Sequence, residues 1–198
     1  MPVSYTNRKG VSYILYRGRT RTSKPRYYFG RPGQSQDEPV PDIPPGFTIS
    51  ESFNGVVSLV KDRPALIQPE EVAAVEAAIQ QHPGARRYRV AVKGNRIEVY
   101  ERVGPDYNAL VSELHIPGLS RPGLAEELRA LEEHHAHYTP VLRFTLLDPK
   151  LRLFSVERMC HLGSIDGWLE LHVQTGSVSK LARELIPTLG TEQFYELW

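Results

Sequence analysis

Residues 88–102 read YRVAVKGNRIEVYER, and this stretch indicates how the chain folds. Apolar and polar residues alternate on both sides of Gly94-Asn95, a pair that favours a two-residue turn between antiparallel strands. Such a turn predicts a β-hairpin, because side chains two positions apart on a strand point to the same side of the sheet. The residues expected to share one face are Tyr88, Val90, Val92, Ile97 and Val99.

A second hairpin is predicted for residues 47–60, around Asn54-Gly55. A two-residue type I′ turn at this pair would place Phe53 opposite Val56 and Ile49 opposite Val60. The apolar residues of both strands would then lie together on one face.

Helical patterns separate these hairpins from further strands. A helix is expected to begin at Pro69, where Glu70 and Glu71 complement the helix dipole. Other expected helices are 106–114, 122–137, 178–186 and a short one after Thr191, and other expected strands are 141–147, 151–158 and 168–173. The sequence therefore predicts an α+β fold with a mainly antiparallel sheet built from hairpins and with three to five helices.

Charge divides the chain unevenly. Residues 1–33 contain eight basic and no acidic residues, whereas the remainder has 16 basic and 23 acidic residues, a formal charge of +8 against −7. Residues 32–45 contain five prolines, which favour extended backbone. We therefore expect a basic, aromatic β-hairpin module at 1–31, a Pro-rich linker at 32–45 and an α+β body at 46–198.

The N-terminal segment also interleaves its cations with aromatic rings. Arg and Lys neutralise phosphates, and flat rings on a sheet can stack on unpaired bases. The predicted nucleic-acid-binding residues are Arg8, Lys9, Tyr13, Tyr16, Arg17, Arg19, Arg21, Lys24, Arg26, Tyr27 and Tyr28. The alternative is that the rings pack against the rest of the protein and the cations keep an edge strand soluble.

A histidine cluster lies at 133–137. On a helix, Glu133, His134 and His137 would lie close enough on one face to ligate a metal ion. The alternative is a polar helix end, since histidines near a helix C-terminus complement its dipole. No further ligand has a recognisable spacing, so these three are weak metal candidates and no cofactor is expected.

The sequence contains no recognisable catalytic motif, and we assign no catalytic residues. Cys160 is the only cysteine, which excludes an intrachain disulfide and a cysteine-based zinc site. No apolar run approaches the roughly 20 residues that a membrane helix needs. The N-terminus lacks the pattern of a signal peptide. We therefore expect a cytoplasmic protein without membrane association.

Three segments resemble parts of uncharacterised bacterial proteins of about this length: Asn7–Val11, Lys24–Phe29 and Gly163–Trp168. That resemblance implies no activity. The N-terminal hairpin with its following linker also resembles the arm-binding modules of tyrosine recombinases. The chain has no Arg-His-Arg-Tyr catalytic set, so recombinase activity is not implied.

The sequence thus favours a non-enzymatic nucleic-acid-binding or accessory protein that contacts RNA or DNA through residues 1–33. A protein–protein interaction module is the alternative, in which the basic hairpin binds an acidic partner or a second copy of the chain. A small metal-dependent hydrolase centred on His134 and His137 is the third hypothesis.

Overall fold

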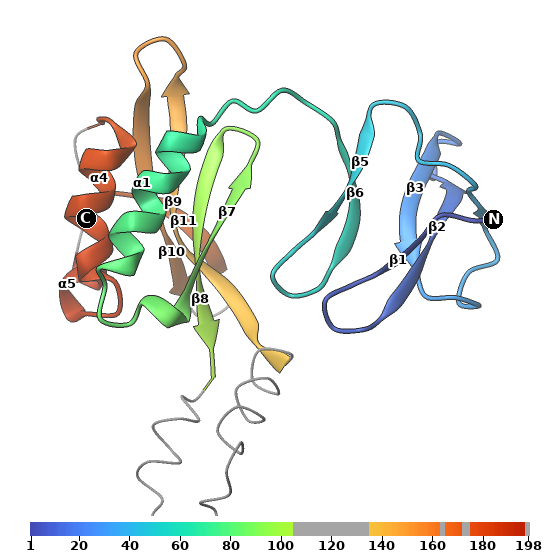
Figure 1. The fold of residues 1–198 in the computed structure, drawn as a ribbon, viewed down its shortest axis with the longest axis horizontal. Helices are drawn as coiled ribbons and strands as arrows, with labels where there is room; N and C mark the ends of the chain where they lie inside the picture. Colours follow the sequence, from blue (N-terminus) through green and yellow to red (C-terminus); the bar gives the residue numbers. More distant parts are fainter. Residues whose placement is uncertain (105–134, 163–164, 172–174, 197–198) are drawn as a thin grey trace, which may run out of the picture. The chain divides into compact units, whose positions relative to one another are not determined.

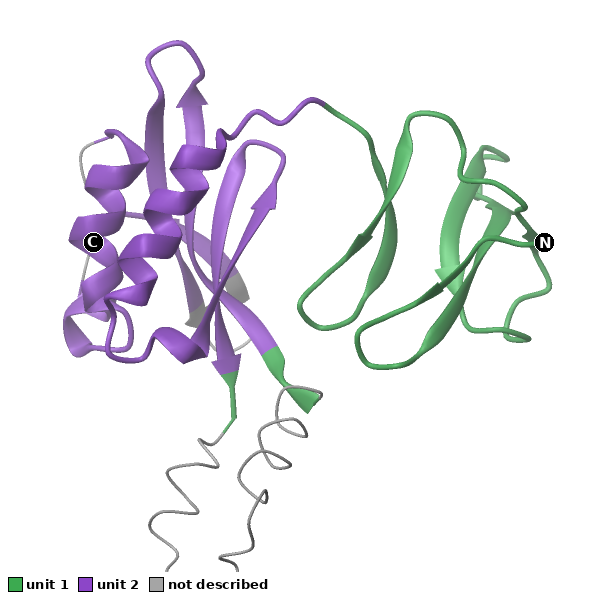
Figure 2. Ribbon diagram, viewed as in Figure 1, with its two compact units in different colours: residues 1–63, 103–137 green, residues 64–102, 138–198 purple. Residues whose placement is uncertain are grey.

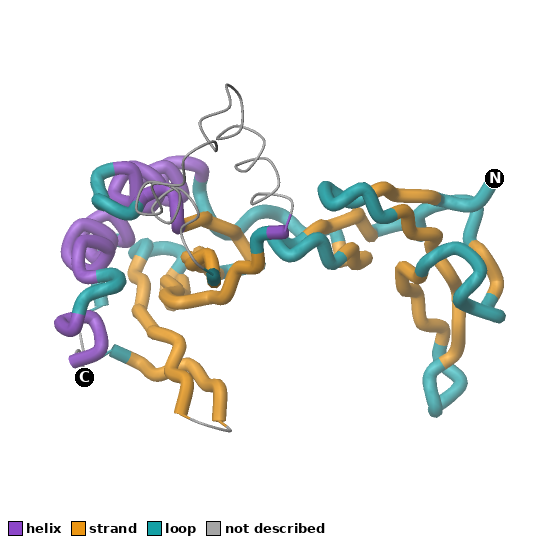
Figure 3. The backbone as a smooth tube through the Cα atoms, turned by 90° about the horizontal axis from the view of Figure 1, so that it is seen from below, coloured by secondary structure: helices purple, strands orange, loops and turns teal. Residues whose placement is uncertain are grey.

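The computed structural model describes residues 1–104, 135–162, 165–171 and 175–196. The chain forms two compact units, one of residues 1–63 and 103–137 and the other of residues 64–102 and 138–198 (Figure 2). We call them unit 1 and unit 2. Antiparallel sheet predominates (Figure 3), and helices α1, α4 and α5 all belong to unit 2, which confirms the predicted α+β class.

Unit 1 is built from two small sheets. In the first, β2 (Ser12–Arg19) lies between β3 (Pro25–Gly30) on one side and β1 (Ser4–Thr6) and β4 (Glu38–Pro39) on the other. The second sheet is the hairpin of β5 (Phe47–Glu51) and β6 (Val57–Lys61). The predicted N-terminal hairpin is therefore present as β2 and β3.

The Pro-rich residues 32–45 belong to unit 1, which differs from the linker that we expected there. Strand β4 pairs with β2, and Val40 both donates a backbone hydrogen bond to Leu15 and accepts one from Val3. The unit boundary lies after Arg63. Prolines are compatible with this position because a short edge strand does not need every backbone N–H.

The β5–β6 hairpin has a different register from the predicted one. Ile49 pairs with Leu59, and Thr48 pairs with Val60. The chain turns through three residues rather than two, because Ser52 donates a backbone hydrogen bond to Val56 and Gly55 adopts a left-handed conformation, with φ of +76°. A shift of one residue moves Val60 to the opposite face from Ile49.

Unit 2 is a five-stranded antiparallel sheet with helices on one face (Figure 1). The strand order is β11-β10-β9-β8-β7, so strands adjacent in the chain are adjacent in the sheet. The strands are β7 (Tyr88–Lys93), β8 (Arg96–Val103), β9 (His137–Asp148), β10 (Leu153–Leu162) and β11 (Ile165–Glu170). The β7–β8 hairpin has the predicted register, with Val92 opposite Ile97.

Helices α1 (Pro69–Gln80) and α4 (Val178–Leu185) pack against the sheet, and the short α5 (Glu192–Glu196) follows α4. Single 3-10 turns lie at η1 (Ala85–Arg87) and η2 (Ile186–Thr188). The core combines fully buried side chains of both layers, such as Val75 of α1, Phe144 of β9 and Leu181 of α4. The structure confirms the predicted start of α1 at Pro69 and of α4 after Ser177.

The predicted helix 106–114, and 122–134 of the helix expected at 122–137, lie outside the described residues. The end of the second prediction is wrong, because His137 is the first residue of β9. Pro140 disfavours helical backbone at Thr139, and Tyr138 buries its ring as a strand residue. His137 therefore cannot continue the helical spacing from His134.

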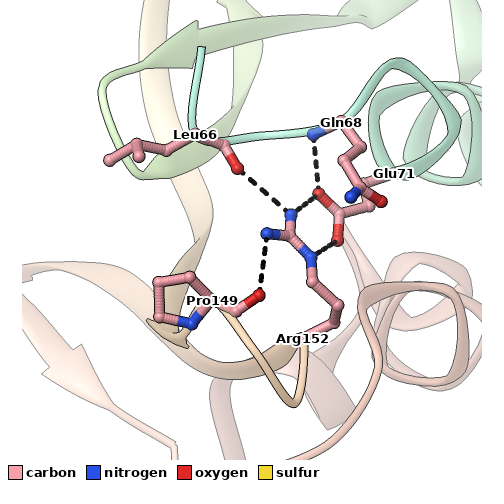
Figure 4. A network of polar contacts seen from close by, with 5 residues as sticks. All are labelled: Leu66, Gln68, Glu71, Pro149 and Arg152. Carbon is pink, nitrogen blue, oxygen red and sulfur yellow. Dashed lines mark hydrogen bonds and ion pairs between the residues drawn. The ribbon is translucent and has the colours of Figure 1, made fainter. Parts of the chain in front are cut away.

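One polar network joins the β9–β10 turn to the start of α1 (Figure 4). Arg152 donates two hydrogen bonds to the carboxylate of Glu71 and further ones to the backbone oxygens of Leu66 and Pro149. Glu71 also accepts a hydrogen bond from the backbone N–H of Gln68, as in a capping box. Glu71 therefore stabilises the start of α1 and, through Arg152, holds the β9–β10 turn in place.

Candidate nucleic-acid interface

Strands β2 and β3 form a two-stranded ribbon whose pairing assigns each side chain to a face. Arg17 pairs with Tyr27, and Gly18 pairs with Arg26. Arg17, Arg19 and Tyr27 therefore share one face, while Tyr16, Arg26 and Tyr28 share the other. The turn between the strands carries Arg21 and Lys24. We call residues 17–26 the basic tip.

On the first face, the aromatic residues pack toward the β5–β6 hairpin. Leu15 is fully buried, and Tyr13 and Tyr27 are half-buried. The ring centroid of Tyr27 lies 6.5 Å from that of Phe47 on β5. These rings help to hold the two sheets of unit 1 together.

On the second face, Tyr16 and Tyr28 stack on each other. Their ring centroids are 5.9 Å apart, and Tyr16 is only 3% exposed. The Tyr28 hydroxyl donates a hydrogen bond to Asp37 at 2.6 Å, which raises the pKa of Tyr28 above its ordinary value. A Cβ on Gly18 would lie 2.4 Å from the same carboxylate, so a larger residue there would require the Asp37 side chain to move.

The tyrosines predicted to stack on bases are thus engaged within unit 1. Tyr16 is buried, and Tyr13, Tyr27 and Tyr28 are half-buried. The packing predicted as the alternative accounts for the rings. The cations, unlike the rings, are exposed to solvent.

The cations of the basic tip extend into solvent. Arg17, Arg19, Arg21, Lys24 and Arg26 are all exposed. Within the described part of the chain, none of the first four forms an ion pair with a carboxylate. The guanidinium of Arg26 lies 5.5 Å from the centroid of the Tyr28 ring. Five cations are therefore presented within ten consecutive residues.

The structure separates Arg8 and Lys9 from this group. Both lie in the turn between β1 and β2, at the opposite end of β2 from the basic tip. The backbone N–H of Arg8 donates a hydrogen bond to Glu51, and Lys9 is half-buried. With a strand rise of about 3.3 Å per residue, the five residues of β2 from Ser12 to Tyr16 keep the two groups roughly 17 Å apart.

The turn of the basic tip is held in one conformation by its own hydrogen bonds. Thr20 and Lys24 are joined by a backbone hydrogen bond of 2.9 Å, and the Thr20 hydroxyl accepts a second bond from the Lys24 N–H. Ser23 adopts a left-handed backbone with φ of +59°. As at Gly55, the loop has three residues and ends in this conformation.

An open hollow of about 360 Å³ lies beside the basic tip. It is lined by Arg17, Gly18, Arg19, Ser23, Pro25 and Glu38. Glu38 is the backbone partner of Arg17 in the β2–β4 pairing. The hollow therefore presents two guanidinium groups and one carboxylate, so that an anion entering it would meet both attraction and repulsion.

Charge separation between the units is weaker than between the segments chosen from sequence. Unit 1 contains 12 basic and 11 acidic residues, a formal charge of +1, and unit 2 contains 12 basic and 12 acidic residues, a formal charge of 0. The acidic residues of 37–62 and 103–137 offset the basic residues of 1–33. The positive charge is concentrated at the basic tip rather than over all of unit 1.

The structure describes only part of the predicted histidine cluster. Glu133 and His134 lie outside the described residues, and His137 is exposed at the start of β9. Across 1–104, 135–162, 165–171 and 175–196, no three His, Cys, Asp or Glu side chains gather as metal ligands.

Sequence reasoning missed a polar network on the face of the unit 2 sheet opposite the helices. Glu98 is buried, accepts a hydrogen bond from the Tyr100 hydroxyl at 2.5 Å and forms an ion pair with Lys93 at 2.9 Å. Burial, followed by the bond to Glu98, raises the pKa of Tyr100. The pKa of Lys93 is also raised, because its bonds to Tyr100 and Glu98 outweigh the effect of burial.

Tyr100 is therefore neutral and Lys93 charged near neutral pH. Next to them, Arg143 forms two hydrogen bonds with Glu157 and lies 4.2 Å from the centroid of the Trp168 ring. The alternation of strands β8, β9 and β10 is the signal that places these residues on one face. Their arrangement stabilises the sheet.

None of the helices in the described residues is both long enough and apolar enough to cross a membrane. The chain matches no protein-family model, no curated protein and no solved structure.

Proposed function

We propose that this protein binds nucleic acid without catalysing a reaction, and that the basic tip contacts the phosphate backbone. The observation that supports this proposal most directly is the set of exposed cations at residues 17–26, four of which form no ion pair with a carboxylate in the described residues. Arg and Lys in such an arrangement release counterions when they neutralise phosphates, which gives affinity without sequence preference.

Because the tyrosines are buried or half-buried, we propose that binding uses the cations and not base stacking. Tyr28, whose hydroxyl donates a hydrogen bond to Asp37, and Tyr27, whose ring packs near Phe47, are half-buried and offer little surface for base stacking. Binding is therefore expected to depend on charge and to be strongly weakened by salt. The cytoplasm, where nucleic acid is abundant, is the compartment that we propose for this function.

The test is a triple variant, Arg19→Ala with Arg21→Ala and Lys24→Ala. Its affinity for labelled nucleic acid is measured by fluorescence anisotropy over a series of salt concentrations. Removal of three phosphate contacts should reduce the slope of log affinity against log salt by about 3 and weaken binding by tenfold or more.

The matched control replaces three exposed cations of unit 2: Arg86→Ala, Lys150→Ala and Lys180→Ala. This variant loses the same charge, so an effect of net charge alone would weaken both variants equally. Equal weakening, or unchanged affinity of the first variant, would contradict the proposal. Sedimentation of the intact protein at low and high salt then tests the second possibility, in which the basic tip binds another protein chain.

A further inference from the structure

The basic tip carries cations on both faces and at its end, which is more than a surface for one strand of nucleic acid requires. Arg17 and Arg19 lie on one face and Arg26 on the other, as the pairing of β2 with β3 requires. Arg21 and Lys24 lie in the turn that joins the two strands. A ligand that contacts all five must surround the ribbon on two sides.

The ribbon also stands clear of its neighbouring strands at this point. Strand β3 is an edge strand of its sheet, and β4 pairs with β2 only at Tyr16 and Arg17. Among the described residues, 19–25 therefore form a hairpin of two strands with no third strand paired beside it. Its turn is fixed by the Thr20–Lys24 hydrogen bonds, so little conformational entropy is lost when it binds.

The thickness of such a ribbon determines which groove of a nucleic-acid duplex it can enter. Strands lie about 4.8 Å apart and side chains on both faces give a layer roughly 10 Å thick. The major groove of B-form DNA is about 12 Å wide, whereas the minor groove is about 6 Å wide. The major groove of A-form RNA is too narrow and deep for such an element.

Single strands are disfavoured by the same structure. Sequence-independent binding of single strands uses exposed aromatic rings as stacking platforms, and the rings beside the basic tip are buried or half-buried. The ribbon thus offers charge and shape rather than stacking surface.

We infer that the ligand of the basic tip is duplex DNA and that residues 19–25 enter its major groove. Arg17 and Arg19 then face the phosphates of one wall, Arg26 faces those of the other, and the turn points to the floor of the groove. This inference rests on the proposed function. Contacts to both walls are what a groove provides and a flat phosphate surface does not.

Two carboxylates limit how deeply the ribbon can enter. Glu38 lines the hollow with Arg17 and Arg19, and Asp37 bonds to Tyr28 on the other face. Both lie at the base of the hairpin, where the phosphates of a groove edge would approach. Glu38 therefore opposes binding, and its neutral variant should bind DNA more tightly.

Fluorescence anisotropy with the full chain tests the inference, using four labelled probes of one sequence: a DNA duplex, an RNA duplex and the two corresponding single strands. Each probe is about 20 residues long per strand, or two helical turns. The DNA duplex should bind at least tenfold more tightly than the other three. Netropsin, which fills the minor groove, should not displace the protein.

Three variants test the geometry on the DNA duplex. Arg17→Ala with Arg19→Ala should weaken binding by several-fold or more, Arg26→Ala should also weaken it, and Glu38→Gln should strengthen it. The gain expected for Glu38→Gln cannot arise from misfolding. Hydrogen exchange at the Leu15 amide, which bonds to Val3, checks that the alanine variants are folded.

The outcomes separate the two proposals. Equal or tighter binding of single strands or of the RNA duplex overturns this inference but leaves nucleic-acid binding standing. Displacement by netropsin, or an Arg26→Ala variant with unchanged affinity, also overturns entry into the major groove. Failure of every probe to bind overturns both proposals.

Discussion

At the scale of single residues, Asn7 joins two turns of unit 1 through its buried side chain. It is only 5% exposed, and its amide nitrogen donates a hydrogen bond of 2.7 Å to the backbone oxygen of Gly55 in the β5–β6 turn. Its amide oxygen accepts bonds from the backbone N–H groups of Lys9 and Val11. One side chain therefore satisfies groups from two turns that are 48 residues apart.

We expect Asn7→Ala to destabilise unit 1 by about 2 kcal/mol, because it leaves a buried carbonyl and two N–H groups without their partner. Hydrogen exchange at the Leu15 amide measures this change. Thr6→Ala is the control, since the hydroxyl of Thr6 makes one exposed contact with Ser12 and should contribute little. Equal exchange rates in the two variants would contradict the role assigned to Asn7.

At the scale of elements, the two hairpin predictions had different outcomes for a local reason. The Gly94-Asn95 hairpin has the two-residue turn that its sequence predicts. At Asn54-Gly55 the strands pair one residue out of the predicted register, because Gly55 is the third residue of its loop. Asn7, which donates a hydrogen bond to Gly55, lies 48 residues away in the sequence, so the Asn54-Gly55 dipeptide alone does not predict this contact.

The cross-strand pair Arg143–Glu157 predicts how unit 2 responds to acid. Hydrogen bonds from Arg143 lower the pKa of Glu157 from its ordinary value of 4.5. A carboxyl group with a lower pKa in the folded state stabilises the fold above the unfolded pKa. That contribution is lost as the pH falls below 4.5 and through the folded value.

We therefore expect the urea midpoint of unit 2, followed by tryptophan fluorescence, to fall less on acidification in Glu157→Gln than in the original protein. Glu184→Gln, an exposed change on α4, is the control and should keep the original pH dependence. Parallel pH profiles for Glu157→Gln and the original protein would show that the ion pair makes no difference to folding.

At the scale of the whole molecule, the two units have separate cores. The large cluster of buried apolar residues, from Ile67 to Phe194, lies entirely in unit 2. The buried residues Leu15, Tyr16 and Val57 of unit 1 do not belong to it. Both tryptophans of the chain, Trp168 and Trp198, lie in unit 2.

We expect the units to unfold in separate transitions. Leu142→Ala should lower the tryptophan-monitored stability by about 3 kcal/mol, because it leaves a cavity in the unit 2 core. It should leave exchange at Leu15 unchanged, and Asn7→Ala should have the reverse pattern. One coincident transition in all three proteins would instead show that the units fold as one.

The sequence by itself determined the elements whose signals are local. The start of α1 at Pro69, the β7–β8 hairpin and the α+β class follow from capping, turn chemistry and periodicity within a few residues. The positive charge of residues 17–26 was likewise visible in the sequence. Contacts between segments that lie far apart in the sequence were not predicted.

Only the tertiary structure decided which rings are covered, where the first unit ends and how the cations are divided between two faces. Tyr16 is buried by strand pairing and ring stacking, and residues 32–45 join unit 1 through backbone hydrogen bonds to β2. Burial depends on segments that lie far apart in the chain, and a backbone hydrogen bond can form between almost any two residue types. Local composition therefore does not encode either of them, whereas it does encode a turn, a helix start or a concentration of charge.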